Sequence, residues 1–172
     1  LGLLGIGLIA SSSAAINQIL DVEVDSKMAR TKNRPLVKGE ISVSSAKIFS
    51  GVLLITGSVI LLVFINQLTL VLTLLTWAFY SFLYTKILKV AGTQNIVIGG
   101  IAGAMPPLLG WTAITNSIDA LPLLMVLIIF IWTPPHFWAL AINRKEDYVA
   151  AKIPMMPVIK GPAYTKIQIV LY

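Results

Sequence analysis

Asn17, Asp21 and Asp25 stand four residues apart at the end of an apolar stretch. Residues at this spacing share one face of an α-helix, whereas Glu23 would point to the opposite side. Two carboxylates and an amide are oxygen donors that suit a hard cation such as Mg²⁺, which proteins usually share with substrate phosphates. The spacing therefore predicts a Mg²⁺ site for a phosphate-containing substrate.

Basic residues follow this acidic cluster, and Arg30 and Arg34 are again four residues apart. Arginine binds phosphate oxygens through two parallel hydrogen bonds. Acidic and then basic residues predict a site for a Mg²⁺-bound diphosphate, contacted by Asn17, Arg30 and Arg34. The alternative is a solvated loop with basic side chains at a membrane surface. Carboxylates at the end of a membrane helix are costly and usually functional, which favours the site.

A second cluster repeats the pattern later in the chain, where Asn143 and Asp147 are four residues apart and Arg144 is adjacent. On the same side of a helix bundle, this cluster could hold the same diphosphate from the opposite direction. Lys86 and Lys89 lie between the two clusters in sequence. They could reach the diphosphate, or they could anchor a helix end at the membrane surface.

His136 is the only histidine. One interpretation is a neutral side chain that is hydrogen-bonded inside the bundle. The others are a ligand of haem iron or an acid–base group.

The composition requires a membrane protein. The 172 residues are 57% hydrophobic and 12% charged, against about 25% charged residues in soluble domains. A disordered chain is also excluded, because it would be polar and poor in apolar residues. The chain has no cysteine, which excludes a disulfide framework and a cysteine nucleophile. The net charge of +6 favours binding to a membrane surface or to an anionic substrate. The chain lacks the stripe of basic and aromatic residues that would indicate nucleic-acid binding.

Five stretches have the roughly 20 apolar residues that a membrane-spanning helix needs. A sixth begins near Ala163. We expect an all-α, polytopic bundle in the lipid bilayer, with residues 1–172 forming a single domain that is incomplete at both ends. Pro106 and Pro107 should kink the fourth span, either for packing alone or to widen a substrate chamber. The five spans cover approximately residues 1–20, 46–65, 68–84, 95–114 and 120–141.

Of the 13 Lys and Arg residues, twelve fall between the first and second spans, between the third and fourth, or after the fifth, and Lys47 lies at the start of the second span next to the first of these segments. If the helices alternate in direction, these segments share one face of the membrane. The positive-inside rule predicts that this face is the cytoplasmic side of a bacterial inner membrane, or the matrix side of a mitochondrial inner membrane.

The Asn-x-x-x-Asp-x-x-x-Asp run that starts at Asn17 resembles the motif of the UbiA superfamily of intramembrane prenyltransferases. Other segments resemble the branch of that superfamily that farnesylates haem, and together they cover nearly the whole chain. Two departures are Asn143, where the superfamily usually has Asp, and the absence of Arg-Thr before residue 95, which leaves Lys89 as the nearest cation. The similar segments are 25–36, 84–85, 95–100, 102–108, 110–111, 132–141, 147–148 and 153–155.

This resemblance implies a Mg²⁺-dependent enzyme that transfers a farnesyl group from farnesyl diphosphate to the vinyl group of haem B, forming haem O in haem A biosynthesis. Asp21, Asp25 and Asp147 would be the catalytic metal ligands, with Asn143 beside them. Arg30, Arg34, Arg144, Lys86 and Lys89 would contact the diphosphate, and His136 would contact the haem. Two alternatives are a related prenyltransferase with an aromatic quinone precursor as acceptor, and a transporter or lipid-binding membrane protein.

Overall fold

The computed structural model describes residues 1–88 and 92–172, and all regular structure in these residues is helical. The helices, in chain order, are α1 (Gly2–Leu20), α2 (Val22–Ser26), α3 (Val43–Phe64), α4 (Gln67–Ala78), η1 (Phe79–Leu88), α6 (Asn95–Ala104), α7 (Pro106–Thr115), α8 (Ala120–Asn143), α9 (Lys145–Ala150), α10 (Met156–Ile159) and α11 (Gly161–Leu171).

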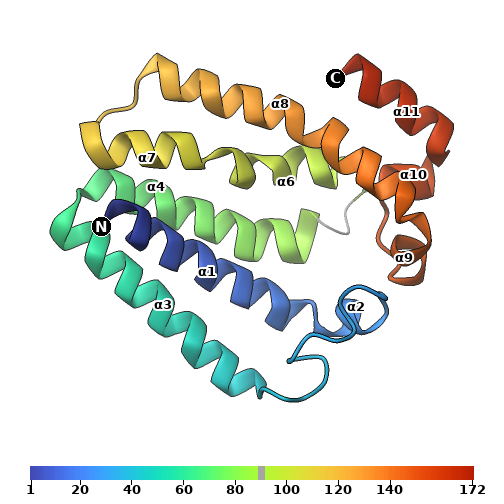
Figure 1. The fold of residues 1–172 in the computed structure, drawn as a ribbon, viewed down its shortest axis with the longest axis horizontal. Coiled ribbons are helices and arrows are strands. Elements are labelled where there is room, and N and C mark those ends of the chain that lie inside the picture. The colour runs from blue at the N-terminus through green and yellow to red at the C-terminus, as the bar shows by residue number, and fades with distance from the viewer. Residues whose placement is uncertain (89–91) are drawn as a thin grey trace.

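Five helical segments are long and apolar enough to cross a membrane, which confirms the prediction of a multi-pass, all-α membrane protein. Successive spans run in opposite directions (Figure 1). The third span reaches Leu88, beyond the predicted end near Tyr84. The five spans are Gly2–Leu20, Val43–Phe64, Gln67–Leu88, Asn95–Thr115 and Ala120–Asn143.

Helix α1 lies between α3 and α4 (Figure 1), and it packs closely against α3. Glycine permits this close approach. A Cβ atom added to Gly57 would lie 2.8 Å from the backbone oxygen of Gly5, and one added to Gly5 would lie 2.7 Å from Leu61. Small residues at such crossings allow membrane helices to gain van der Waals contact. The crossing holds α1, and therefore the acidic residues that follow it, in a fixed position.

The fourth span is divided into two helices, because α6 ends at Ala104 and α7 begins at Pro106. Pro106 and Pro107 have no backbone N–H to donate to the preceding turn. The predicted kink is therefore present as a break. By contrast, α8 continues through Pro134 and Pro135.

The third span changes from α-helix to π-helix at Phe79. In a π-helix each backbone N–H pairs with the carbonyl five residues earlier, and such segments are frequent at functional sites. The Thr85 hydroxyl follows the same spacing and donates to the Tyr80 carbonyl at 2.8 Å. This segment faces the end of α1.

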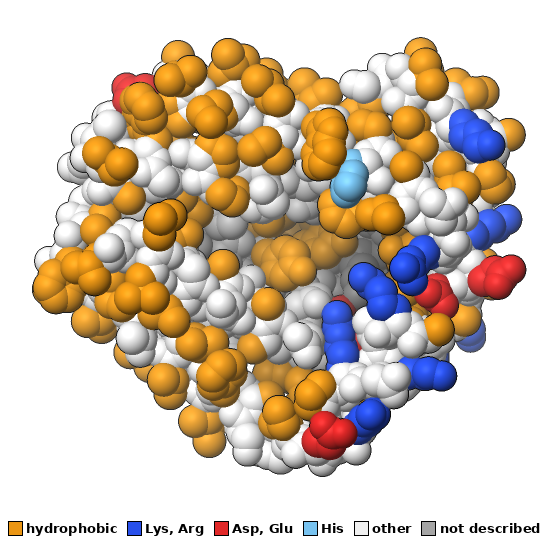
Figure 2. Space-filling model, in the orientation of Figure 1, with side chains coloured by type: hydrophobic (Ala, Val, Ile, Leu, Met, Phe, Trp, Pro, Cys, Tyr) orange, Lys and Arg blue, Asp and Glu red, His pale blue; other side chains and the backbone are white. Residues whose placement is uncertain are grey.

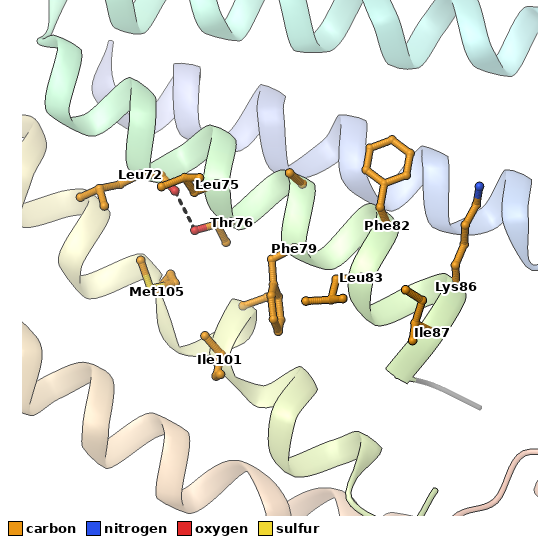
Figure 3. A pocket seen from close by; sticks show the side chains of 12 residues that line it. Leu72, Leu75, Thr76, Phe79, Phe82, Leu83, Lys86, Ile87, Ile101 and Met105 are labelled. Atoms are coloured by element: carbon orange, nitrogen blue, oxygen red, sulfur yellow. Dashed lines mark hydrogen bonds between the residues drawn. The ribbon is translucent and has the colours of Figure 1, made fainter. Parts of the chain in front are cut away.

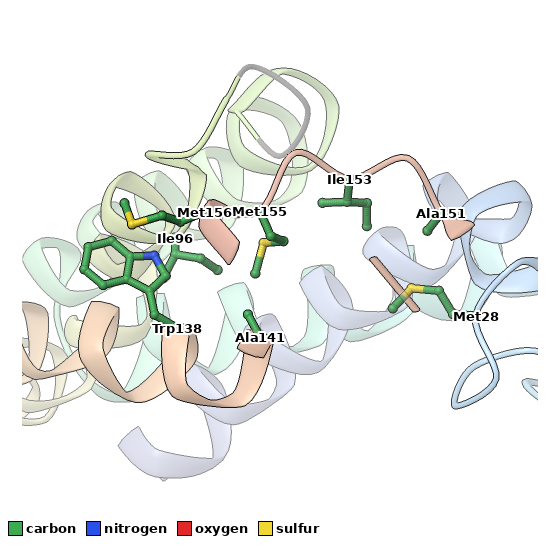
Figure 4. Close-up of a cluster of buried hydrophobic side chains, with 8 residues drawn as sticks. All are labelled: Met28, Ile96, Trp138, Ala141, Ala151, Ile153, Met155 and Met156. Carbon is green, nitrogen blue, oxygen red and sulfur yellow. The ribbon is translucent and has the colours of Figure 1, made fainter. Parts of the chain in front are cut away.

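A buried cluster at the same end of the bundle joins parts of the chain that are far apart in sequence (Figure 4). It connects the segment after α2 with α6, α8 and the segment that follows α9. Trp138 is its largest side chain and is 1% exposed. The cluster comprises Met28, Ile96, Trp138, Ala141, Ala151, Ile153, Met155 and Met156.

Lys and Arg side chains gather at one end of the molecule, next to a hollow in the visible face (Figure 2). Among the described residues they lie after α1, at the start of α3, near the end of η1 and after α8, and these parts of the chain lie at that end (Figure 1). The predicted placement of the basic segments at one end of the bundle is thus present in the fold.

Candidate active site

A cavity of about 250 Å³ lies at the basic end of the bundle. Its wall combines side chains from α1, α2, η1, α6, α8 and α9 with residues from the segments that follow α2 and α9. The lining residues are Asn17, Asp21, Asp25, Met28, Arg30, Thr31, Arg34, Tyr80, Tyr84, Asn95, Ile96, Phe137, Tyr148, Ile153 and Met155.

The first acidic cluster lines this cavity, although α1 ends at Leu20, before Asp21 and Asp25. Asp21 separates α1 from α2, and the Asp25 N–H still donates to the Asp21 carbonyl at 2.7 Å. The helical spacing is therefore kept across the junction. Asp21 and Asp25 are only 5% and 4% exposed, and the Asn17 amide donates to Asp21 Oδ2 at 2.9 Å. The three side chains share a face, as their spacing predicted.

Arg34 provides the nearest positive charge. Its guanidinium donates to Asp25 Oδ2 at 2.5 Å, and the Thr31 hydroxyl donates to the Asp25 carbonyl at 2.9 Å. Burial of a carboxylate is costly unless it is paired, and Arg34 supplies that partner. Arg30 also lines the cavity, is exposed, and forms no ion pair within the described residues. The cavity therefore presents two carboxylates and two guanidinium groups to a ligand.

Glu23 lies between the two buried carboxylates in sequence but faces away from the cavity. It is exposed and accepts a hydrogen bond from Lys27 at 2.7 Å. This hydrogen bond, with the charge of Lys27, lowers the pKa of Glu23 below its usual value. The contrast with Asp21 and Asp25 follows directly from the helical period.

An aromatic wall faces the carboxylates, and sequence reasoning did not assign it to the site. Tyr80 and Tyr84 stack with ring centroids 5.6 Å apart. Gly99 makes room for this wall, because a Cβ atom at that position would overlap the Tyr84 ring. Their spacing of four residues was a usable signal, although aromatic pairs at this spacing more often belong to a packed core.

Asn95 and Tyr148 are two further lining residues that were not assigned to the site. The Asn95 amide donates to Met155 Sδ at 3.5 Å, and its side-chain oxygen accepts from the Ile96 N–H at 2.7 Å. Asn95 starts α6, where polar side chains are common for structural reasons, so sequence alone did not distinguish its role.

The second cluster does not line the cavity. Asn143 and Arg144 are exposed and Asp147 is half-buried, while the neighbouring Tyr148 lines the wall instead. Adjacent residues on a helix point about 100° apart, and here Tyr148 rather than Asp147 is directed at the cavity. The roles assigned to Asn143, Arg144 and Asp147 stay predictions.

Lys86 lies on a different and larger cavity of about 860 Å³, between the third span and α6 (Figure 3). Its ammonium group is 5.9 Å from the centroid of the Phe82 ring. Apart from Lys86 and Thr76, the side chains that line this cavity are apolar. Lys89 lies outside the described residues. A diphosphate contact for either lysine therefore also remains a prediction.

His136 is exposed on α8. Its ring stacks on Trp132, with centroids 4.4 Å apart, and meets Phe137 edge to face at 5.5 Å. Phe137 in turn lines the polar cavity. The histidine is thus one residue away from the cavity wall, on an aromatic surface rather than inside the bundle.

An apolar cavity of about 310 Å³ adjoins the polar one, and Tyr80 lines both. It lies between α1, α4, α6 and α7 and includes Pro106 and Gly103, next to the break in the fourth span. A molecule with a charged head and an apolar tail could occupy the two cavities together.

The donor set fits Mg²⁺. Within the described residues, no group of three or more His, Cys, Asp and Glu side chains could hold a metal ion. Mg²⁺ does not need such a group, because it is commonly bound by one or two carboxylates together with substrate phosphates and water. Asp21 and Asp25, with the side-chain oxygen of Asn17, would provide the protein ligands.

The profile of the UbiA prenyltransferase family matches residues 1–172. The chain belongs to this family, which confirms the prediction from its motifs. No solved structure matches the chain.

Three curated relatives are named as protoheme IX farnesyltransferases. The protein from Saccharophagus degradans is 59% identical over 172 residues, or 100% of this chain and 57% of the relative. Protoheme IX farnesyltransferase 2 from Pseudoalteromonas atlantica is 57% identical over 171 residues, or 99% and 56%. The protein from Colwellia psychrerythraea is 56% identical over 170 residues, or 99% and 56%. The chain therefore spans little more than half the length of these relatives.

Proposed function

We propose that the protein containing this chain transfers a farnesyl group from farnesyl diphosphate to a vinyl group of haem B, which forms haem O. The observation that carries the proposal is the pairing of a polar cavity, with two buried carboxylates and two arginines, with an adjoining apolar cavity. The names of the relatives support the choice of donor and acceptor.

In this proposal the diphosphate occupies the polar cavity and the farnesyl chain occupies the apolar one. Bound Mg²⁺ would neutralise part of the diphosphate charge. Arg30 and Arg34 stabilise the negative charge that grows on the leaving group as the C1–O bond breaks, and such stabilisation is often the largest catalytic contribution. The apolar wall keeps water from the allylic cation.

The vinyl carbon of haem then supplies the electrons for the new bond to C1. The diphosphate leaves with the electron pair of the broken C1–O bond. Addition of water to the remaining cationic carbon, with loss of a proton, completes the balance. Tyr80 lies at the junction of the two cavities, where C1 would be held.

The direct test is to incubate the full-length protein with haem B, farnesyl diphosphate and Mg²⁺, and to measure the mass of the haem product and the diphosphate released. We expect both a farnesylated haem and an equal amount of diphosphate. Farnesylation of an aromatic quinone precursor in place of haem would contradict the acceptor. No release of diphosphate with either acceptor would contradict the enzyme and favour a transporter or lipid-binding protein.

We infer that the basic end faces the cytoplasm, or the matrix in a mitochondrion, because basic segments are retained on that side. Reporter fusions after Lys38 and Lys152 should then report the cytoplasmic side, and fusions after Asn66 and Asn116 the external side. A fusion that reports the opposite side would contradict the orientation.

We also propose that His136 helps to bind haem. The ring is exposed and stacked on Trp132 beside the cavity wall, where a flat aromatic acceptor could be held. His136→Ala should weaken haem B binding and leave binding of a farnesyl diphosphate analogue nearly unchanged. Spectroscopic titration with each ligand separately decides this, and unchanged haem affinity would assign His136 a purely structural role.

A further inference from the structure

Asn17 uses both of its amide hydrogens inside the protein. Its Nδ2 atom donates to Asp21 Oδ2 at 2.9 Å and to the hydroxyl oxygen of Thr85 at 3.3 Å. An ionised carboxylate can only accept hydrogen bonds, so the first contact already requires the NH₂ group on that side. The second contact comes from the third span and is independent of the first.

Thr85 can only be an acceptor for Asn17, because its own hydroxyl hydrogen is used elsewhere. The Thr85 hydroxyl donates to the Tyr80 carbonyl at 2.8 Å. This bond exists because the segment is a π-helix, in which residues five apart pair. Thr85 is 6% exposed, so water has little access as a competing partner.

The consequence concerns the other end of the amide. With both hydrogens of Asn17 directed at Asp21 and Thr85, the polar atom left for a ligand is the side-chain oxygen. Asn17 lines the polar cavity, so it offers that ligand an acceptor. An acceptor attracts a cation and disfavours direct contact with a phosphate oxygen.

We propose that Thr85 is a positioning residue that fixes the orientation of the Asn17 amide, so that its oxygen serves as a cation ligand and its NH₂ group stays away from the diphosphate. The inference rests on the proposed function, since it concerns the metal that would accompany the diphosphate. Partners that orient metal ligands in this way typically change metal affinity by about 10- to 100-fold when removed.

The test measures binding of Mn²⁺, as a paramagnetic substitute for Mg²⁺, to the full-length protein in the presence of inorganic pyrophosphate, by electron paramagnetic resonance. Thr85→Val keeps the shape of the side chain but removes the acceptor. We expect Mn²⁺ affinity to fall about tenfold. Thr85→Ser, which keeps the hydroxyl, should restore most of it.

Thr73→Val is the matched control. Thr73 is also buried in the third span, and its hydroxyl donates to the carbonyl of Thr69 at 2.7 Å. It lines the apolar cavity but not the polar one, and inorganic pyrophosphate has no farnesyl chain that would enter the apolar cavity. This variant should cost similar thermal stability and leave Mn²⁺ affinity unchanged. Equal losses of affinity in the two valine variants would assign Thr85 a merely structural role and overturn the proposal.

A double-mutant cycle with Asn17→Ala gives a second criterion. Without the Asn17 amide there is nothing to orient, so Thr85→Val should cause no further loss of Mn²⁺ affinity in that background. Additive losses would overturn the role of Thr85. Asp21→Asn separates this inference from the proposed function. If Asp21→Asn leaves Mn²⁺ affinity intact, the proposed metal site is wrong. If Asp21→Asn lowers Mn²⁺ affinity but Thr85→Val does not, only the inference about Thr85 is rejected.

Discussion

Two clusters of polar residues repeat the same four-residue spacing in different surroundings. The first follows the end of α1 and comprises Asn17, Asp21 and Asp25, and the second follows the end of α8 and comprises Asn143 and Asp147. The first set lies on the wall of a cavity, with its carboxylates buried and Asp25 paired with Arg34. The second set is exposed or half-buried and does not line that cavity. Equal spacing in sequence therefore does not give equal geometry: a helical hydrogen bond links Asp25 to Asp21 across the first junction, whereas α8 ends at Asn143 and Asp147 lies in the separate helix α9.

The physical difference lies in what covers each cluster. The Tyr80–Tyr84 pair of η1 lines the same cavity as Asp21 and Asp25, and both carboxylates are buried. Charges act on a ligand more strongly at a buried site than on an open surface. The comparison therefore predicts unequal effects for chemically equal substitutions.

The largest effect is expected at the buried carboxylates. Asp21→Asn or Asp25→Asn in the full-length protein should lower turnover about 100-fold or more, because each removes a carboxylate that would hold the Mg²⁺ accompanying the diphosphate. Initial rates of farnesylated haem formation measure this. Activity close to that of the unmodified protein in either variant would contradict the assignment of the cavity as the active site.

The second-largest effect is expected at Arg34 of the first cluster, and it should exceed the effect at Arg144 of the second cluster. Arg34→Gln should raise the KM for farnesyl diphosphate about tenfold, because charge-assisted hydrogen bonds of this kind are worth roughly 1.5–3 kcal/mol. Arg144→Gln, at an exposed position, should change it far less. Steady-state kinetics with varied farnesyl diphosphate would test the pair, and a larger effect for Arg144 would reverse the comparison.

Smaller effects are expected at the acidic and amide positions of the second cluster. Asp147→Asn and Asn143→Ala should each reduce turnover at most about fivefold, the range of an exposed charge pair. If Asp147→Asn is instead as damaging as Asp21→Asn, Asp147 is a metal ligand as its sequence context predicted. The same assay, with thermal unfolding as a control for stability, distinguishes these outcomes.

The smallest effect is expected for Glu23→Gln, which changes a carboxylate between the two buried ones in sequence. Because Lys27 lowers the pKa of Glu23, the carboxylate is charged at neutral pH, and any stability the pair adds is lost only as pH falls through that lowered pKa. Turnover at neutral pH should match the unmodified protein. A loss comparable to Asp21→Asn would show that helical facing does not select the functional carboxylates.

Patterns along one element were sufficient to predict several features correctly. The apolar stretches predicted all five spans, and Pro106 with Pro107 predicted the interruption that separates α6 from α7. The end of the third span was placed too early, near Tyr84, because the sequence shows no sign that the helix continues as a π-helix to Leu88.

Three features were predictable without any knowledge of the tertiary structure: the membrane spans, the gathering of basic segments at one end, and the shared face of Asn17, Asp21 and Asp25. The spans depend on length and the shared face on the helical period, both of which act within one element. The gathering of basic segments follows from the order of the spans, because successive spans alternate in direction. Tertiary structure alone decided that Asp21 and Asp25 line a cavity and Asp147 does not, and that Lys86 faces another cavity. Those outcomes depend on distances between elements, which close packing at Gly5 and Gly57 and the π-helical turn at Thr85 set.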